Sequence, residues 1–193
     1  NYYYLTLMNE NYIHPKRPRN ATNFAIMKGA YKFKNVKNPK LRLLASGLTL
    51  RFAISAADIL SKMNVTAEIW SVTSFNELAR EGTAVDREKF YESNQKKSYV
   101  EECFGTQMPT LAVSEYQKLY AEQIRKWVKG NYVCLGTDGF GRSDTREKLR
   151  SFFEIDTKHI VFNSLKALCM DNEAKKYAEE NNIKFNSKHY LKR

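Results

Sequence analysis

The chain has 193 residues, 42% of them hydrophobic and 13% aromatic, with a formal net charge of +11. This composition suits one globular domain and excludes an intrinsically disordered chain, and no apolar run approaches the roughly 20 residues that span a bilayer. Three widely spaced cysteines, Cys103, Cys134 and Cys169, form neither a disulfide framework nor a zinc motif and favour a reduced, cytoplasmic setting.

The basic charge is concentrated at the two ends of the chain. Residues 1–43 carry a net charge of +8 and residues 158–193 a net charge of +4, whereas the middle of the chain is nearly neutral. Lys32 and Lys34 lie in a short predicted strand, where lysines are typical of a solvated sheet edge. No aromatic-rich basic module accompanies them. We therefore expect neither a nucleic-acid partner nor a membrane partner.

The first predicted element is a strand over residues 2–8, in which tyrosine and leucine side chains alternate between two faces. Pro15 and Pro18 exclude regular structure from the segment that follows. Because this strand has no partner before it in the sequence, it is expected to pair with a neighbouring domain. The predicted division is therefore residues 1–20 as the end of a preceding domain plus a linker, and residues 21–193 as the main domain.

From residue 21 onward, short apolar runs alternate with segments of helical periodicity. The runs predicted as strands are Ala30–Lys34, Leu41–Ser46, Thr66–Val72, Thr110–Ser114 and Tyr132–Gly136. Helices are predicted near Thr22–Lys28, over Leu48–Met63, from Ser74 onward, over Tyr116–Val128, near Thr145–Phe153 and near Lys158–Cys169. This alternation predicts a three-layer α/β/α fold around a largely parallel sheet.

A glycine-rich stretch, "GTDGFGRSD", lies between the last predicted strand and the helix that follows it. Backbone amides in this position can hold a phosphate, but the glycine spacing matches neither the dinucleotide fingerprint nor the P-loop. Asp144 followed by Glu147 instead predicts an acidic capping box with Asp144 as the N-cap. Two interpretations stay open, an interface turn and an anion site. The candidate residues are Asp138, Gly139, Phe140, Gly141, Arg142, Ser143 and Asp144.

The other polar motifs do not assemble an active site. The three histidines lie in the linker, in a helix and in the tail, without a matched nucleophile, and the pair Glu101 and Glu102 is interpreted as a solvated face. Asp138 and Asn163 have about the spacing of the magnesium ligands in thiamine-diphosphate enzymes, but Asn163 falls inside a helical pattern. We predict no catalytic, cofactor-binding or metal-binding residue in this chain.

Four stretches carry a specific resemblance: "YYYLTLMNENYIHP", "SVTSFNELAREG", "YQKLYAEQIRKWV" and "LGTDGFGRSDTREKLRSFFEID". They resemble the C-terminal part of the homodimeric bacterial pyruvate dehydrogenases, the thiamine-diphosphate-dependent decarboxylating component of the pyruvate dehydrogenase complex. The resemblance runs from Tyr2 to about Leu168. It fades over residues 83–109 and in the lysine-rich tail after Cys169.

The resemblance implies a transketolase-type C-terminal domain, with a mixed, mostly parallel five-stranded sheet and Ala30–Lys34 as its one antiparallel edge strand. It also implies that residues 2–8 belong to a preceding pyrimidine-binding domain. Thiamine diphosphate and Mg are expected in the full-length enzyme but not in this chain. The implied partners are the remaining domains, a second copy in a homodimer and the dihydrolipoyl acetyltransferase core.

The resemblance thus implies an enzyme that decarboxylates pyruvate and acetylates a lipoyl group, within which this chain is a structural or interface domain that is inactive alone. The alternative is a stand-alone ligand- or protein-binding module derived from the same domain, with Asp138, Arg142 and Ser143 as its site. Because the chain begins inside a predicted strand, we expect it to be part of a longer protein.

Overall fold

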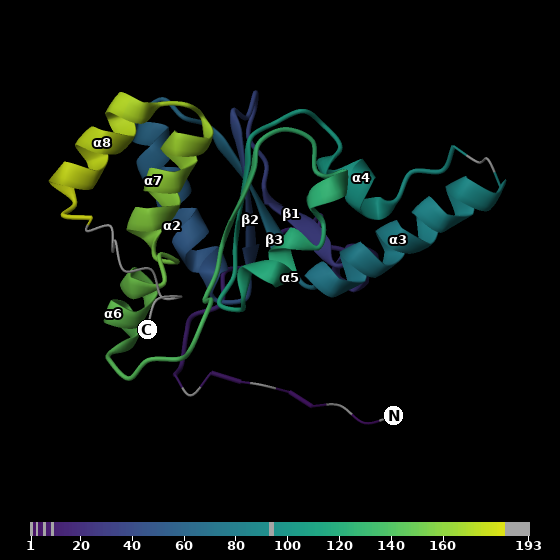
Figure 1. The fold of residues 1–193 in the computed structure, drawn as a ribbon, viewed down its shortest axis with the longest axis horizontal. Helices are drawn as coiled ribbons and strands as arrows, with labels where there is room; N and C mark the ends of the chain where they lie inside the picture. Colours follow the sequence, from purple (N-terminus) through teal and green to yellow (C-terminus); the bar gives the residue numbers. More distant parts are fainter. Residues whose placement is uncertain (1, 3, 6, 9, 93–94, 184–193) are drawn as a thin grey trace.

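The computed structural model describes residues 2, 4, 5, 7, 8, 10–92 and 95–183. Within these residues helices and strands alternate along most of the chain (Figure 1). The elements in chain order are α1 (Asn23–Lys28), β1 (Ala30–Lys34), β2 (Leu41–Ser46), α2 (Thr49–Lys62), β3 (Ala67–Val72), α3 (Phe75–Glu92), α4 (Tyr99–Phe104), β4 (Thr110–Val113), α5 (Lys118–Glu122), the 3₁₀-helix η1 (Arg125–Trp127), β5 (Tyr132–Leu135), α6 (Arg146–Phe152), α7 (Thr157–Ala167) and α8 (Asp171–Glu180).

The strands form one mixed sheet in the order β1-β3-β2-β4-β5. Strands β3, β2, β4 and β5 are parallel, and β1 runs antiparallel to β3 at one edge. The predicted sheet, including its antiparallel edge strand, is confirmed. Because the four parallel strands end on the same edge of the sheet, the segments that follow them gather there.

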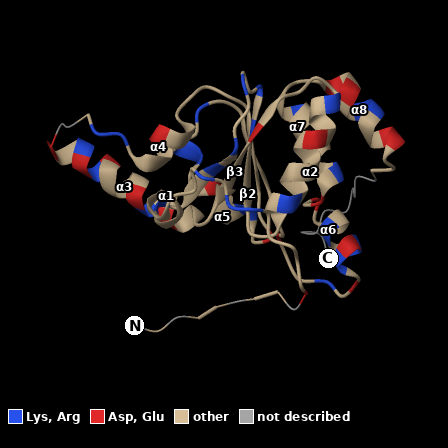
Figure 2. Cartoon of the chain, turned by 180° about the vertical axis from the view of Figure 1, so that it is seen from behind, with Lys and Arg blue, Asp and Glu red and all other residues tan. Residues whose placement is uncertain are grey.

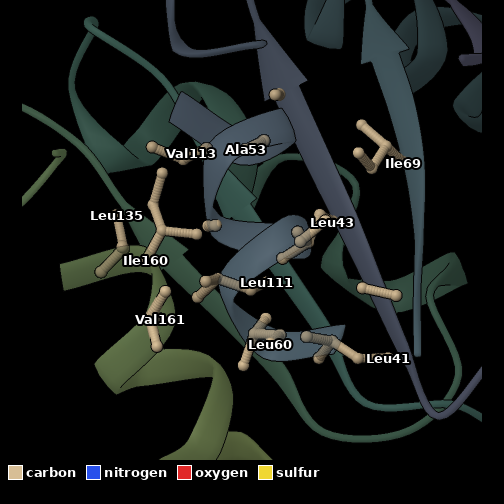
Figure 3. Packing of buried hydrophobic residues seen from close by; sticks show 14 of the residues in the cluster. Leu41, Leu43, Ala53, Leu60, Ile69, Leu111, Val113, Leu135, Ile160 and Val161 are labelled. Atoms are coloured by element: carbon tan, nitrogen blue, oxygen red, sulfur yellow. The ribbon is translucent and has the colours of Figure 1, made fainter. Parts of the chain in front are cut away.

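Helices cover both faces of the sheet (Figure 1). On one face, Leu43 and Leu111 pack with Leu60 of α2 and Ile160 of α7 in a buried core (Figure 3). Leu44, the neighbour of Leu43, belongs to the second core on the other face, with residues of α3 and α4. Adjacent residues of β2 are therefore buried on opposite faces, as expected for a central parallel strand.

The second core contains a buried ion-pair network. Glu68 of β3 accepts hydrogen bonds from Arg42 of β2 and from the Trp70 indole, both at 2.9 Å. Lys32 of the edge strand lies 2.8 Å from the other oxygen of the same carboxylate. Arg42 also donates to the backbone carbonyl of Phe104 at 3.3 Å. Arg42 and Glu68 are nearly inaccessible to solvent. Their pairing therefore offsets the desolvation cost of burying two charges.

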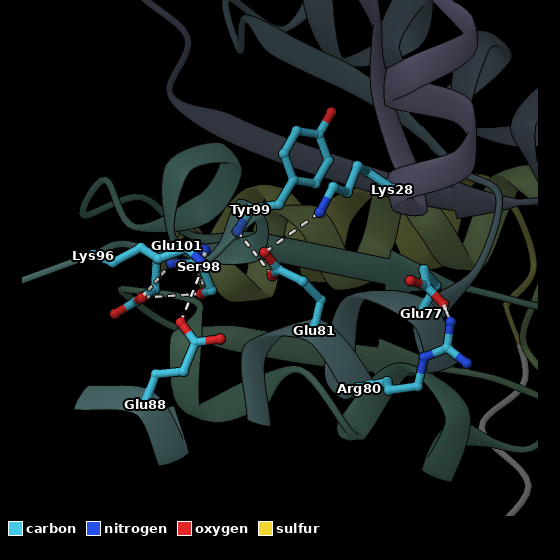
Figure 4. Close-up of polar contacts among 9 residues, drawn as sticks. All are labelled: Lys28, Glu77, Arg80, Glu81, Glu88, Lys96, Ser98, Tyr99 and Glu101. Atoms are coloured by element: carbon cyan, nitrogen blue, oxygen red, sulfur yellow. Dashed lines mark hydrogen bonds and ion pairs between the residues drawn. The ribbon is translucent and has the colours of Figure 1, made fainter. Parts of the chain in front are cut away.

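Helix α4 is absent from the sequence prediction, and its cap corrects the interpretation of Glu101. Ser98 and Glu101 form a capping box at the start of this helix, and Lys89 of α3 lies 2.8 Å from the Glu101 carboxylate. Burial alone would raise the pKa of Glu101, but the bonds from Lys89 and Ser98 lower it to about 2. Figure 4 shows Ser98 and Glu101 beside the polar contacts between α3 and the start of α4. Glu101 is thus a helix-capping residue and not part of a solvated face.

The single helix predicted over Tyr116–Val128 is wrong, because α5 and η1 replace it. The change of helix type brings Trp127 against Gly82 of α3, where an added Cβ would lie 2.7 Å from the indole ring. The Trp127 indole N–H donates to Asp86 at 3.1 Å. Long-range contacts of this kind can override a helical pattern in the sequence.

The strand predicted over residues 2–8 is not observed at the positions that the structure describes, Tyr2, Tyr4, Leu5, Leu7 and Met8. Tyr3 and Thr6 lie outside the described residues. None of the described strands pairs with these positions, and the expected pairing with a neighbouring domain stays a prediction. Helix α8 was not predicted either; it packs Ala174 and Tyr177 against the first core. Among the helices in the described residues, none has the length and apolar character needed to cross a bilayer.

Candidate functional site

The glycine-rich loop leaves β5 at the edge of the sheet where the parallel strands end. Gly136 is required at the start of this loop, because a Cβ there would lie 2.6 Å from the backbone oxygen of Tyr116. The Thr137 amide donates to the same oxygen at 2.9 Å, and its hydroxyl donates to the Glu115 carbonyl. The loop is thus fixed, at its start, to the segment that follows β4.

Asp138 caps helix α5, which precedes it in the chain. Its Oδ1 atom accepts a hydrogen bond of 2.8 Å from the backbone amide of Lys118, the first residue of α5. Gln117, the N-cap residue of α5, provides no side-chain cap of its own. An Asp carboxylate at this position both satisfies a free amide and complements the helix dipole. The Asp138 carboxylate thus stabilises the start of α5.

The tip of the loop, residues 139–143, is exposed to solvent. Gly139 has a φ of +79°, a left-handed conformation that glycine adopts without strain. Phe140 is 71% exposed, and Gly141 has open space around it. The Arg142 guanidinium lies over the Phe152 ring at 5.7 Å, whereas Ser143 is exposed. Asp138 and Arg142 therefore contact two different helices, α5 and α6.

The predicted cap of the following helix is displaced by one residue. Thr145, and not Asp144, is the N-cap of α6, because its hydroxyl accepts from the Lys148 amide at 3.4 Å. Asp144 accepts from the Thr145 amide at 2.7 Å and lies 3.5 Å from the Lys148 ammonium. A carboxylate just before the cap therefore orders the turn and complements the helix start.

Sequence reasoning missed a polar cluster beside the loop. Glu115, in the segment that follows β4, lies 3.6 Å from Arg150 of α6, and Arg150 donates to the Tyr12 hydroxyl at 3.2 Å. Burial raises the pKa of Glu115 even though Arg150 opposes that shift. These residues come from three distant parts of the sequence, so spacing along the chain gave no signal of their proximity.

The described residues provide no metal centre: none of their His, Cys, Asp and Glu side chains form a group that could hold an ion. The Asn163 amide donates to the His159 carbonyl within α7 at 2.9 Å, while Asp138 binds α5. Burial raises the pKa of Cys134 to about 12 and that of Cys103 to about 11. Both are therefore thiols at neutral pH and poor nucleophiles.

Comparison with known proteins decides the family. The family model described as the transketolase-like TK C-terminal domain matches residues 29–156, which include the whole sheet and the glycine-rich loop. The chain belongs to the transketolase C-terminal domain family. Its mixed sheet with one antiparallel edge strand is accordingly that of a transketolase C-terminal domain.

Relatives and solved structures agree with this assignment. The chain is 48% identical to the pyruvate dehydrogenase E1 component of Pseudomonas aeruginosa over 86% of this chain. It is 44% identical to that of Buchnera aphidicola over 96% of this chain. It spans 20% and 21% of those relatives. A transketolase from Pichia stipitis aligns with a TM-score of 0.57 at 15% identity, covering 80% of this chain and 20% of that one. At this identity the structural likeness supports the fold alone.

Proposed function

We propose that this chain is the C-terminal domain of a pyruvate dehydrogenase E1 enzyme, which decarboxylates pyruvate and acetylates the lipoyl group of an acetyltransferase core. The observation that carries the proposal is the 48% identity to a pyruvate dehydrogenase E1 component over 86% of the chain. The transketolase C-terminal domain fold is consistent with it.

Within that enzyme, the proposed role of this transketolase C-terminal domain is structural. Thiamine diphosphate with Mg would supply the carbanion chemistry of the full enzyme, but the residues here do not fit its ligand motif. Asp138 already accepts the Lys118 amide, and Asn163 is engaged inside α7. We therefore assign cofactor binding to other parts of the enzyme, and homodimer and core contacts to the assembled protein.

We further propose that the tip of the glycine-rich loop, Gly139–Ser143, is an interface with the rest of the enzyme. Support comes from the exposed Phe140 at the tip and from the exposed Tyr116 and Leu119 on the same edge of the sheet. Such side chains are typical of surfaces that are covered in an assembly. The anion-site alternative has less support, since the Asp138 carboxylate would repel an anion at the base of the loop.

The test begins with the size of the native polypeptide, measured by immunoblot of source cells with an antibody raised against this chain. We expect a band several times larger than 22.5 kDa. The protein captured by that antibody should acetylate a lipoyl domain from pyruvate, whereas the 193-residue chain with thiamine diphosphate and Mg should not. A native band at 22.5 kDa, or turnover by the chain alone, would overturn the proposal.

A further inference from the structure

Residues 10–15, here named the strap, pass across the end of the sheet where the parallel strands terminate. In Figures 1 and 2 the N-terminal segment runs beneath the sheet and turns toward it near the loop that leads to α6. A cavity of about 460 Å³ lies between the strap and the start of α2, with Leu48 and Leu50 in its wall. This cavity separates part of the strap from the core beneath it, so polar contacts contribute to its attachment.

Three arginines from two helices make those contacts. Arg146 of α6 forms an ion pair with Glu10, and Arg150 of the same helix donates to the Tyr12 hydroxyl at 3.2 Å. Arg51 of α2 places its guanidinium over the Tyr12 ring at 5.0 Å. Tyr12 also donates a hydrogen bond to Glu10, so the carboxylate and the phenol are recognised together by charged donors and cation–π contact.

The same contacts help to hold α6. No residue of α6 is buried, and only its partly buried Leu149 and Phe152 pack against the first core. Arg150 is the exception among its polar residues, since its side chain is only 16% exposed and also reaches Glu115 in the segment that follows β4. A seven-residue helix has little stability of its own, so contacts with the strap and with Glu115 contribute to its order.

We propose that the strap is a recognition element for α6: its Glu10–Tyr12 pair, bound by Arg51, Arg146 and Arg150, holds α6 against the domain. The three arginines thus bind a segment of the same chain, the strap. The inference is independent of the proposed function, because each contact lies within the described residues.

Hydrogen exchange measured by mass spectrometry on the 193-residue chain tests the strap. In Tyr12→Ala we expect the amides of α6 to exchange about five- to tenfold faster, as the loss of several surface contacts predicts, with the sheet unchanged. Tyr4→Ala is the matched control, because Tyr4 is another tyrosine of the N-terminal segment and is 92% exposed. Unchanged exchange of α6 in Tyr12→Ala would overturn the proposal.

A charge swap separates recognition from general loosening. Arg146→Glu should also accelerate exchange in α6, although an acidic residue in the first turn favours the helix itself. The double variant Glu10→Arg/Arg146→Glu should restore protection, because the pair is re-formed with opposite polarity. Acceleration that the swap does not reverse would show that α6 responds to the substitution alone, and it would overturn recognition of the strap by this pair.

Discussion

Glu68 is the common acceptor of the buried network in the second core, so removing its charge leaves Arg42 without a counter-charge. We expect Glu68→Gln to lower the free energy of unfolding by about 3–5 kcal/mol, the usual effect of breaking a buried pair. Chemical denaturation monitored by Trp fluorescence measures it.

The control for Glu68→Gln is Lys34→Ala, which removes an ion pair with Asp58 between side chains that are 44% and 60% exposed. Pairs of that kind add little stability, so the denaturation midpoint should stay near that of the unmodified chain. An equal loss of unfolding free energy in Glu68→Gln and Lys34→Ala would contradict the claim that the buried pair contributes more stability than the exposed pair.

The lowered pKa of Asp156 predicts a pH-dependent contribution to the stability of the fold at the start of α7. Burial alone would raise its pKa, but hydrogen bonds from the His159 ring and amide lower it below its usual value of 3.8. A lowered carboxyl pKa stabilises the fold above the unfolded-state value, and this contribution is lost as the pH falls through the folded-state pKa. Asp156→Asn keeps an N-cap oxygen but removes the charge.

For Asp156→Asn we expect a loss of about 1 kcal/mol in unfolding free energy at pH 7, and a smaller difference from the unmodified chain below about pH 4. Urea unfolding at pH 7 and at pH 3 measures both values. A difference that stays constant with pH would rule out the proposed charge effect. Asp171→Asn, at a carboxylate that is 67% exposed, should change stability little at either pH.

Individual roles were harder to predict than residue positions. The seven loop residues lie where the sequence placed them, between β5 and α6, but Asp138 acts on α5, which precedes it in the chain. That contact depends on β4 and β5 lying side by side, and spacing along the sequence carries no such information. The N-cap of α6 was wrong by one residue because Asp144 and Thr145 are both good caps.

At the scale of elements, the bond between Asp138 and the first amide of α5 predicts that the glycine-rich loop stabilises a helix that precedes it in sequence. Asp138→Ala should lower the free energy of unfolding by about 1 kcal/mol, as for other lost caps. Asp138→Asn keeps an acceptor oxygen and should retain most of that stability. Thermal unfolding of both variants tests this, and equal losses would argue that charge, and not capping, is what Asp138 contributes.

The five strands and the larger helices were predictable because their apolar residues recur at the period of the element and are buried as that period requires. Helix α4 was missed because its six residues span less than two turns and show no clear period. Helix α8 was missed because its buried face consists only of Ala174, Tyr177 and Ala178 in a lysine-rich tail. Helix α5 was predicted too long: it ends at Glu122, and Trp127 of the following 3₁₀-helix packs against Gly82, a long-range contact that the sequence does not reveal.

At the scale of the whole molecule, the transketolase C-terminal domain presents its loop tip and the exposed side chains of α5 on one edge of the sheet. If that edge is covered in a pyruvate dehydrogenase E1 enzyme, Phe140 should matter more in the assembled protein than in the isolated chain. Within the 193-residue chain its side chain is 71% exposed, so Phe140→Asp should leave the unfolding midpoint of this chain nearly unchanged.

In the complete polypeptide, Phe140→Asp should lower both the thermal midpoint and the pyruvate-dependent acetylation of a lipoyl domain, because a charge would be buried at the interface. Phe90→Asp is the matched control: Phe90 is 80% exposed and belongs to the C-terminal end of α3, which is distant from the glycine-rich loop in Figure 1. The two variants should therefore differ in the complete enzyme and agree in the isolated chain. Equal behaviour in both settings would remove Phe140 from the interface and leave the glycine-rich loop with its local role, which is to cap α5 and lead into α6.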